Sequence, residues 1–162
     1  MLWFCDDHLR RLARWLRAAG FDTAYQAAID DGELLRRCRA EGRRLLTLDR
    51  ALARRAGETG CLLPSHDPLE QLRYLVRRFD LDLFSRAFSR CPVCNTALAE
   101  ARPEDVEAPE RVRAVCDRFW RCPDCERTYW RGDHVRHMLR RFESVATRSD
   151  PGDRIDPGEP VQ

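Results

Sequence analysis

The chain has 162 residues, of which 43% are hydrophobic and 35% are charged, and this composition indicates a soluble protein with one ordinary domain and a small appendage. The net charge is only +2, and all 29 basic residues are arginine, so composition alone does not indicate nucleic-acid binding. No apolar run is long enough to cross a membrane, and Asp6 and Asp7 interrupt the apolar start, so we expect neither a membrane span nor a signal peptide. Eight cysteines without an export signal favour a reducing, cytoplasmic compartment and metal ligation over disulfides.

Short apolar runs alternate with helical patterns over residues 1–80. Asp67 and one of the two aspartates Asp30 and Asp31 are placed as helix N-caps, and Gly20 and Gly42 as helix ends. Strands that alternate with helices predict a parallel sheet covered by helices, because parallel strands need crossover connections. The expected strands are residues 2–5, 21–25, 44–47 and 61–63, and the expected helices are residues 9–19, 30–42, 51–56 and 67–79.

The rest of the chain differs in character from this α/β region. Residues 102–110 carry prolines and acids and predict an exposed excursion, while Phe84 and Phe88 are candidates to pack the ribbon against the first domain. The pattern predicts three parts, namely an α/β domain over residues 1–88, a zinc ribbon with a C-terminal helix over residues 89–146, and a disordered tail over residues 147–162.

Four cysteines form two CxxC knuckles, Cys91-Pro92-Val93-Cys94 and Cys122-Pro123-Asp124-Cys125. Two such pairs in a reduced chain are typical of a tetrahedral zinc site, and a disulfide pair or unpaired buried thiols are the alternative. A site with four cysteine ligands has no open coordination position, so we expect this zinc to hold the shape of the ribbon without doing chemistry. We interpret the remaining cysteines as buried apolar residues (Cys5, Cys38 and Cys61) and as a weaker substitute ligand (Cys116).

Acidic residues follow the expected strands. Asp6 comes after the first strand and Asp49 after the third, and three acids, Asp30, Asp31 and Glu33, begin the helix after the second. Because ligands bind beyond the carboxyl ends of strands in parallel α/β sheets, these carboxylates can converge on one divalent ion. Oxygen ligands of this kind suit Mg²⁺ or Mn²⁺. The alternative for each aspartate is a plain helix cap or a solvated surface residue.

Five segments of the chain, taken in order, carry a family resemblance. They are residues 4–17 (FCDDHLRRLARWLR), 30–35 (DDGELL), 45–50 (LLTLDR), 90–95 (RCPVCN) and 122–134 (CPDCERTYWRGDH). Together they resemble the Mut-seven C-terminal RNase family, which joins a PIN-like ribonuclease domain to a zinc ribbon. The resemblance implies a small PIN-like parallel sheet flanked by helices, followed by a C-terminal zinc ribbon.

The resemblance also implies an enzyme, a Mg²⁺- or Mn²⁺-dependent endoribonuclease whose partner is RNA. Asp6 and Asp49 would hold the metal together with an acid from the start of the second helix, where Asp31 is the main candidate and Asp30 and Glu33 are secondary ones. The implied reaction is metal-assisted hydrolysis of a phosphodiester bond. Arg50 is a candidate phosphate contact, or alternatively a surface arginine.

Two arginine clusters leave a second function open. The helix at residues 9–19 carries four arginines, of which Arg14 and Arg17 are weaker candidates for phosphate contacts, and the helix after Asp133 carries three more. These faces could be merely solvated, or they could serve a non-catalytic RNA-binding or adaptor module that grips single strands. His134 and His137 lie three residues apart, but the four cysteines already complete a zinc shell, which favours capping and packing roles for the histidines.

Overall fold

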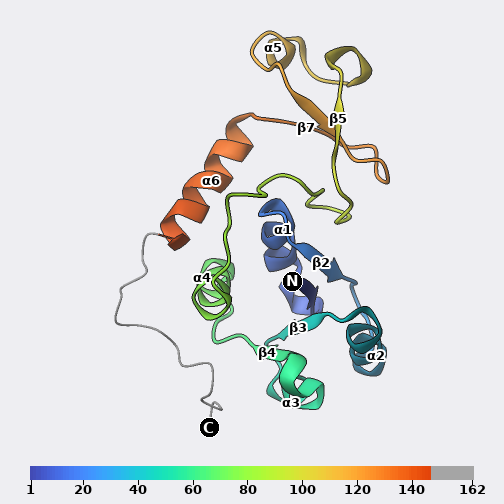
Figure 1. Cartoon of the computed structure of the whole chain (residues 1–162), viewed down its shortest axis with the longest axis vertical. Coiled ribbons are helices and arrows are strands. Elements are labelled where there is room, and N and C mark those ends of the chain that lie inside the picture. The colour runs from blue at the N-terminus through green and yellow to red at the C-terminus, as the bar shows by residue number, and fades with distance from the viewer. Residues whose placement is uncertain (147–162) are drawn as a thin grey trace.

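Four short strands form one parallel sheet in the order β2-β1-β3-β4 (Figure 1). The computed structural model describes residues 1–146, and the tail expected to be disordered lies outside the described residues. The strands are β1 (Leu2–Cys5), β2 (Asp22–Tyr25), β3 (Arg44–Thr47) and β4 (Gly60–Leu62). This arrangement confirms the predicted α/β class, and each predicted strand lies within one residue of its expected bounds.

Helices cover both faces of the sheet (Figure 1). Trp3 and Cys5 point into a core that includes α1 and α4, whereas Phe4, between them, points into a second core under α2 and α3. This alternation follows from the two-residue period of a strand, and burial on both sides explains why β1 is apolar throughout. The helices are α1 (Arg10–Ala18), α2 (Asp31–Glu41), α3 (Arg50–Ala56) and α4 (Pro68–Phe79), with 3-10 turns η1 (Asp7–Leu9) and η2 (Gly57–Thr59).

Aspartate side chains start three of these helices. Asp30, Asp49 and Asp67 each accept hydrogen bonds from two backbone N–H groups of the first turn of α2, α3 and α4. Such caps satisfy donors that have no partner within the helix, and each contributes about 1 kcal/mol. The caps fix where each helix leaves the sheet, and therefore where the acids at these turns lie.

The second part is a small antiparallel ribbon in the strand order β5-β6-β7. Its strands are β5 (Ala99–Ala101), β6 (Phe119–Arg121) and β7 (Thr128–Trp130). The excursion between β5 and β6 holds a 3-10 turn, η3 (Pro103–Asp105), and a short helix, α5 (Glu110–Arg113). The expectation that residues 102–110 are exposed is wrong for Val106, which is 3% exposed and anchors this excursion to the ribbon.

The last helix, α6 (Asp133–Ala146), leaves the ribbon and returns to the α/β part, where it lies beside α4 (Figure 1). Phe142 and Val145 are fully buried in the core shared with α1 and α4. The ring of Phe84 meets that of Phe142 edge-on at 6.4 Å. Phe84, which is 42% exposed, therefore contacts α6, whereas Phe88 packs against the core shared with α1 and α4. Among the described residues, no helix has both the length and the apolar character needed to cross a membrane.

Polar contacts join the first knuckle to the edge strand β2. The guanidinium of Arg17 is buried and donates to the carbonyls of Thr23 (2.7 Å) and Val93 (2.6 Å). Asn95 accepts from the Thr23 N–H (3.0 Å) and donates to Asp22 (2.9 Å). Arg17 therefore holds the two parts together, and its expected role as a phosphate contact is wrong. The boundary between residues 88 and 89 stays a prediction.

The linker into the ribbon passes directly over the end of α1. Gly20 has a φ of +90°, and a Cβ there would lie 2.2 Å from the carbonyl oxygen of Arg86. Only glycine allows both this backbone conformation and this close approach. The N–H of Phe88 also donates to the carbonyl of Ala18 at 2.6 Å. These contacts fix the direction from which the ribbon approaches the α/β part.

Candidate functional site

Asp6 and Asp49 lie at the carboxyl ends of two neighbouring strands. Asp6 directly follows the last residue of β1, and its N–H donates to the carbonyl of Leu46 on β3 at 3.0 Å. Asp49 comes two residues after the end of β3. Because β1 and β3 are paired and parallel, both carboxylates emerge at the same edge of the sheet, as the sequence predicted. We call this region, with Asp6, Thr47 and Asp49, the acid edge.

Thr47, the last residue of β3, connects the two aspartates. Its hydroxyl donates to Oδ2 of Asp6 at 2.7 Å and accepts the backbone N–H of Asp49 at 3.0 Å. Thr47 is completely buried, so this hydroxyl has no access to water and depends on these two partners. The position of the Asp6 carboxylate is thereby coupled to the turn that carries Asp49.

The capping bonds leave one oxygen of Asp49 available. Its Oδ1 accepts from the N–H groups of Ala51 (2.6 Å) and Leu52 (3.0 Å), and no hydrogen bond reaches Oδ2 from the described part of the chain. These backbone hydrogen bonds lower the pKa of the Asp49 carboxyl, so the side chain is ionised at neutral pH. An ionised carboxylate with a free oxygen at a strand end is suited to bind a cation or a hydrogen-bond donor.

The acids at the start of α2 have other partners. Asp30 caps the helix through the N–H groups of Gly32 and Glu33. Asp31 forms an ion pair with Arg55 of α3 at 2.8 Å, and Glu33 forms a two-pronged hydrogen bond with Arg36. The structure brings α2 and α3 together through Asp31 but gives none of these three acids a contact with Asp6 or Asp49. Arg50 opens α3 beside Asp49 and is exposed, as expected of either a phosphate contact or a surface arginine.

Mg²⁺ in proteins keeps several waters and is held by one or two carboxylates together with substrate phosphates. The acid edge fits this pattern, since it offers oxygen ligands only and a free Oδ2 on Asp49. Within residues 1–146, the one group of three or more metal-ligating side chains with converging ligand atoms is the cysteine quartet. An ion at the acid edge would therefore rest on Asp6 and Asp49, with the third position completed by water or substrate.

The four knuckle cysteines, Cys91, Cys94, Cys122 and Cys125, form a separate site. Their sulfur atoms all lie within 4.8 Å of one another, with 3.6 Å between Cys91 and Cys125 and 3.2 Å between Cys94 and Cys122. A tetrahedral zinc with Zn–S bonds of about 2.3 Å places its ligands roughly 3.8 Å apart. The quartet is thus compatible with zinc. Cys116 is outside it, so the prediction of a substitute ligand is wrong.

The two knuckles have matching backbones. In the first, the Asn95 N–H donates to the Cys91 carbonyl at 3.0 Å, and in the second, the Glu126 N–H donates to the Cys122 carbonyl at 2.9 Å. Asn95 and Glu126 both have positive φ, at 76° and 59°. The Tyr129 hydroxyl lies 3.0 Å from the sulfur of Cys91, so an aromatic side chain covers the site.

The knuckle sulfurs differ from one another in protonation, because burial raises the pKa of Cys122 to about 12, whereas hydrogen bonds outweigh burial and lower that of Cys94. Burial acts to raise the pKa of Cys125, but hydrogen bonds from the backbone and side chain of Arg127 and from Cys122 lower it to about 6. In contrast, burial raises the pKa of Cys38 and Cys61 to about 11, and it raises that of Cys5 as well. The thiolate is the metal-binding form. The interpretation of these three cysteines as buried apolar residues is confirmed.

The family model of the Mut7-C RNAse domain matches residues 1–142, which is most of the chain. The chain belongs to this family. The match spans the parallel sheet, the acid edge and the cysteine quartet, so the Mut7-C domain includes both the α/β part and the ribbon. Searches of curated proteins and of solved structures found no match. Membership in a family described as an RNAse domain makes RNA the substrate class to be considered for the acid edge.

Sequence reasoning missed two residues of these Mut7-C sites. Thr47 was counted only as part of a strand, although a single hydroxyl at the end of an apolar strand, just before Leu48-Asp49, was the available signal. Arg17 was assigned to a surface cluster because its spacing matches the exposed arginines of α1. Only the tertiary structure shows that it turns toward β2 and Val93.

Proposed function

We propose that the chain is a Mg²⁺- or Mn²⁺-dependent ribonuclease that hydrolyses phosphodiester bonds of RNA at the acid edge. One observation carries the proposal: Thr47 ties the carboxylate of Asp6 to the turn of Asp49 at the end of two adjacent parallel strands. The Mut7-C RNAse domain supplies the reaction class. A buried hydroxyl destabilises a fold when it lacks hydrogen-bond partners, and the Thr47 hydroxyl finds both of its partners at the acid edge.

Each residue of the acid edge has a role in this proposal. Asp6 and Asp49 would hold the ion, which supplies hydroxide near neutral pH and offsets negative charge on the scissile phosphate. Thr47 orients Asp6 through its donated hydrogen bond. Arg50 is placed next to Asp49 to contact a phosphate. Asp31 is the third proposed catalytic acid, and it would have to give up its ion pair with Arg55 to take part.

The second proposed metal is a structural Zn²⁺ at the cysteine quartet. Four thiolates complete the tetrahedron, so this ion would activate no water. The ribbon is too small to bury a large core, with Phe119, Cys91, Cys122 and Val106 as its buried apolar residues. Metal binding therefore supplies stability that packing cannot provide in a segment of this size.

The test is cleavage of labelled single-stranded RNA with and without Mn²⁺. We expect Mn²⁺-dependent cleavage by the wild-type chain and a loss of about 100-fold or more in Asp6→Asn, because the amide removes the negative charge that faces the ion. The control is Asp82→Asn, since Asp82 caps an exposed turn far from the acid edge. Full activity in Asp6→Asn would refute the proposed site.

A second candidate function, non-catalytic RNA binding, is favoured by one observation. Asp31 and Glu33 are paired with Arg55 and Arg36, so the acids at α2 are neutralised by neighbouring arginines. A chain of this kind would bind RNA equally well with and without Mn²⁺ and would leave it intact. A binding titration of the same RNA beside the cleavage assay distinguishes the two functions, because a binding module would bind the RNA and leave it intact under both conditions.

A further inference from the structure

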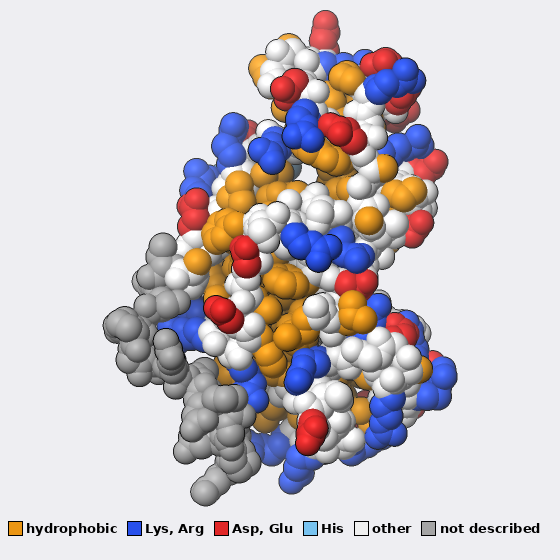
Figure 2. Space-filling model, in the orientation of Figure 1, with side chains coloured by type: hydrophobic (Ala, Val, Ile, Leu, Met, Phe, Trp, Pro, Cys, Tyr) orange, Lys and Arg blue, Asp and Glu red, His pale blue; other side chains and the backbone are white. Residues whose placement is uncertain are grey.

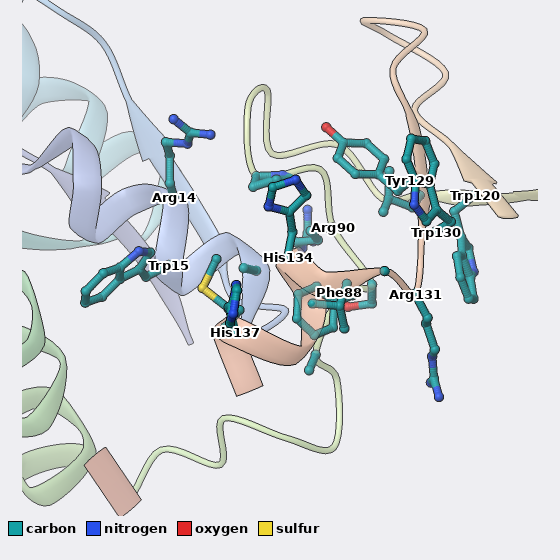
Figure 3. A pocket seen from close by; sticks show the side chains of 18 of the residues that line it. Arg14, Trp15, Phe88, Arg90, Trp120, Tyr129, Trp130, Arg131, His134 and His137 are labelled. Carbon is teal, nitrogen blue, oxygen red and sulfur yellow. The ribbon is translucent and has the colours of Figure 1, made fainter. Parts of the chain in front are cut away.

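A cleft of about 860 Å³ lies where the α/β part meets the ribbon. Its walls come from α1, from the linker at residues 87–92, from β6 and β7, and from the first half of α6. Figure 3 shows Trp15 and Arg14 of α1 on one side, and Trp120, Tyr129 and Trp130 on the other. In Figure 2, hydrophobic side chains gather across this middle region with arginines among them.

The charge of the cleft has one sign. Among residues 1–146, its lining contains no aspartate or glutamate. The guanidinium groups of Arg14 and Arg131 make no hydrogen bond or ion pair within residues 1–146, so both are available to a ligand, whereas Arg90 is held by Asp22 at 3.2 Å. An anionic ligand therefore gains charge-assisted hydrogen bonds without breaking existing ones. The basic side chains of the lining are Arg11, Arg14, Arg90, Arg131, His134, His137 and Arg141.

Aromatic rings alternate with these charges. Trp15 already stacks against two guanidinium groups, those of Arg11 at 5.9 Å and Arg141 at 5.7 Å from its ring centroid. Trp120 and Trp130 are partly exposed on the opposite wall. Aromatic faces in a positively charged groove are the features with which proteins bind single-stranded nucleic acids, because every base has a face that can stack. An acidic peptide would use the arginines but would leave the rings without matching partners.

One wall of the cleft belongs to the helix that follows Asp6. The wall formed by α1 begins just beyond Asp6, and Arg14 lies eight residues further along the chain, which corresponds to roughly 12 Å of helix. The volume of the cleft suits a few nucleotides, whereas a double-stranded helix is recognised by shape across a much longer surface.

We propose that this cleft is a binding site for single-stranded RNA, in which Arg14 and Arg131 contact phosphates and Trp130 stacks a base. This inference rests on the proposed function for its substrate class and adds a second site to it. The ribbon then contributes to substrate binding as well as to the shape of the fold.

The test measures binding separately from cleavage. The protein is the full zinc-bound chain carrying Asp6→Asn, which prevents cleavage during the measurement. It is titrated with a fluorescent single-stranded oligouridine of about ten nucleotides, without added Mg²⁺ or Mn²⁺. The titration is repeated at salt concentrations from about 50 to 200 mM. We expect Arg14→Ala and Arg131→Ala each to weaken binding and to reduce the salt slope by about 0.7. Trp130→Leu is expected to weaken binding about tenfold with a smaller change in slope. The matched control is Arg39→Ala, an exposed arginine of α2 outside the cleft.

The outcomes separate this inference from the proposed function. If Arg14→Ala and Arg131→Ala bind RNA as tightly as Arg39→Ala, the cleft is not the RNA site, whatever the cleavage assay shows. Failure of Asp6→Asn to reduce cleavage would instead refute the acid edge and leave the binding result intact. Tighter binding of a duplex, no binding of single strands, or displacement of the RNA by an acidic peptide would each overturn the assignment.

Discussion

The hydroxyl of Thr47 donates a hydrogen bond to the carboxylate of Asp6 at 2.7 Å, deep at the end of the parallel sheet. The same hydroxyl accepts the N–H of Asp49. A buried hydroxyl can serve two partners in this way only when one accepts and the other donates, and here the Asp6 carboxyl oxygen accepts while the Asp49 N–H donates. The orientation of the acid edge is thus set by a residue that carries no charge.

Thr47→Val tests this relationship. Valine has nearly the same shape, so the strand and its core contacts should persist, while both hydrogen bonds are lost. We expect the free energy of unfolding to fall by about 1 to 2 kcal/mol, because the Asp49 N–H is left without a partner. We expect RNA cleavage to fall by about 10- to 100-fold because Asp6 is no longer oriented.

Thr23→Val provides the matched control. Thr23 is also fully buried, and its hydroxyl donates to the carbonyl of Phe21, away from the acid edge. Both variants should lose similar stability, as measured by denaturant unfolding. Equal loss of cleavage in the two variants would show that the effect of Thr47→Val is a general loss of stability.

Cys91→Ser tests the zinc site. Removal of one thiolate opens the tetrahedron and leaves the buried end of the ribbon without its cross-link, so we expect zinc loss and a lower Tm. Metal analysis of the wild-type chain should give one zinc per molecule. Cys116→Ser, which alters a cysteine outside the quartet, should retain zinc and Tm. Retention of zinc by Cys91→Ser would contradict the assignment.

Asp22→Asn tests the contacts that join the ribbon to β2. Asp22 accepts from Arg43 (2.6 Å) and Asn95 (2.9 Å) and pairs with Arg90. Burial acts to raise the pKa of Asp22, but the hydrogen bonds from Arg43 and Asn95 lower it below its ordinary value of 3.8. Because the Asp22 side chain is only partly buried, we expect the free energy of unfolding of the variant to fall by only about 1 to 2 kcal/mol at neutral pH.

The sign of the pH dependence follows from this lowered pKa. The stabilisation that ionised Asp22 contributes is fully present above the pKa of an unfolded aspartate, about 3.9. It is lost as the pH falls through the lower pKa that Asp22 has in the folded chain. The difference in unfolding free energy between wild type and Asp22→Asn should therefore be constant from about pH 7 to 5 and shrink below about pH 4. A difference that grows on acidification would contradict the ion-pair account.

Much of the fold follows from local patterns in the sequence. The alternation of apolar runs with helical patterns predicted the parallel sheet. The starts of the helices were recognisable because aspartate caps such as Asp30 and Asp67 bond to N–H groups only two or three residues away. The CxxC spacing likewise predicted the cysteine quartet. Both signals are local, so no knowledge of the tertiary structure was needed.

The remaining features depend on packing between distant segments. Nothing near Arg17 in the sequence indicates that its guanidinium bonds to Val93, which is 76 residues away. The cleft between α1 and β7 likewise forms only when α6 returns to the α/β core through Phe142. The acid edge was predictable in part, since the sequence indicated the positions of Asp6 and Asp49 but not the role of Thr47.

The most direct test of the central proposal is the cleavage of single-stranded RNA by Asp49→Asn, with and without Mn²⁺. Asp82→Asn is an unusually close control, because Asp82 accepts from the N–H groups two and three residues ahead, as Asp49 does, but lies away from the acid edge. We predict that Mn²⁺-dependent cleavage falls by about 100-fold or more in Asp49→Asn and is unchanged in Asp82→Asn. Undiminished cleavage by folded Asp49→Asn would contradict the assignment of the acid edge as the catalytic site.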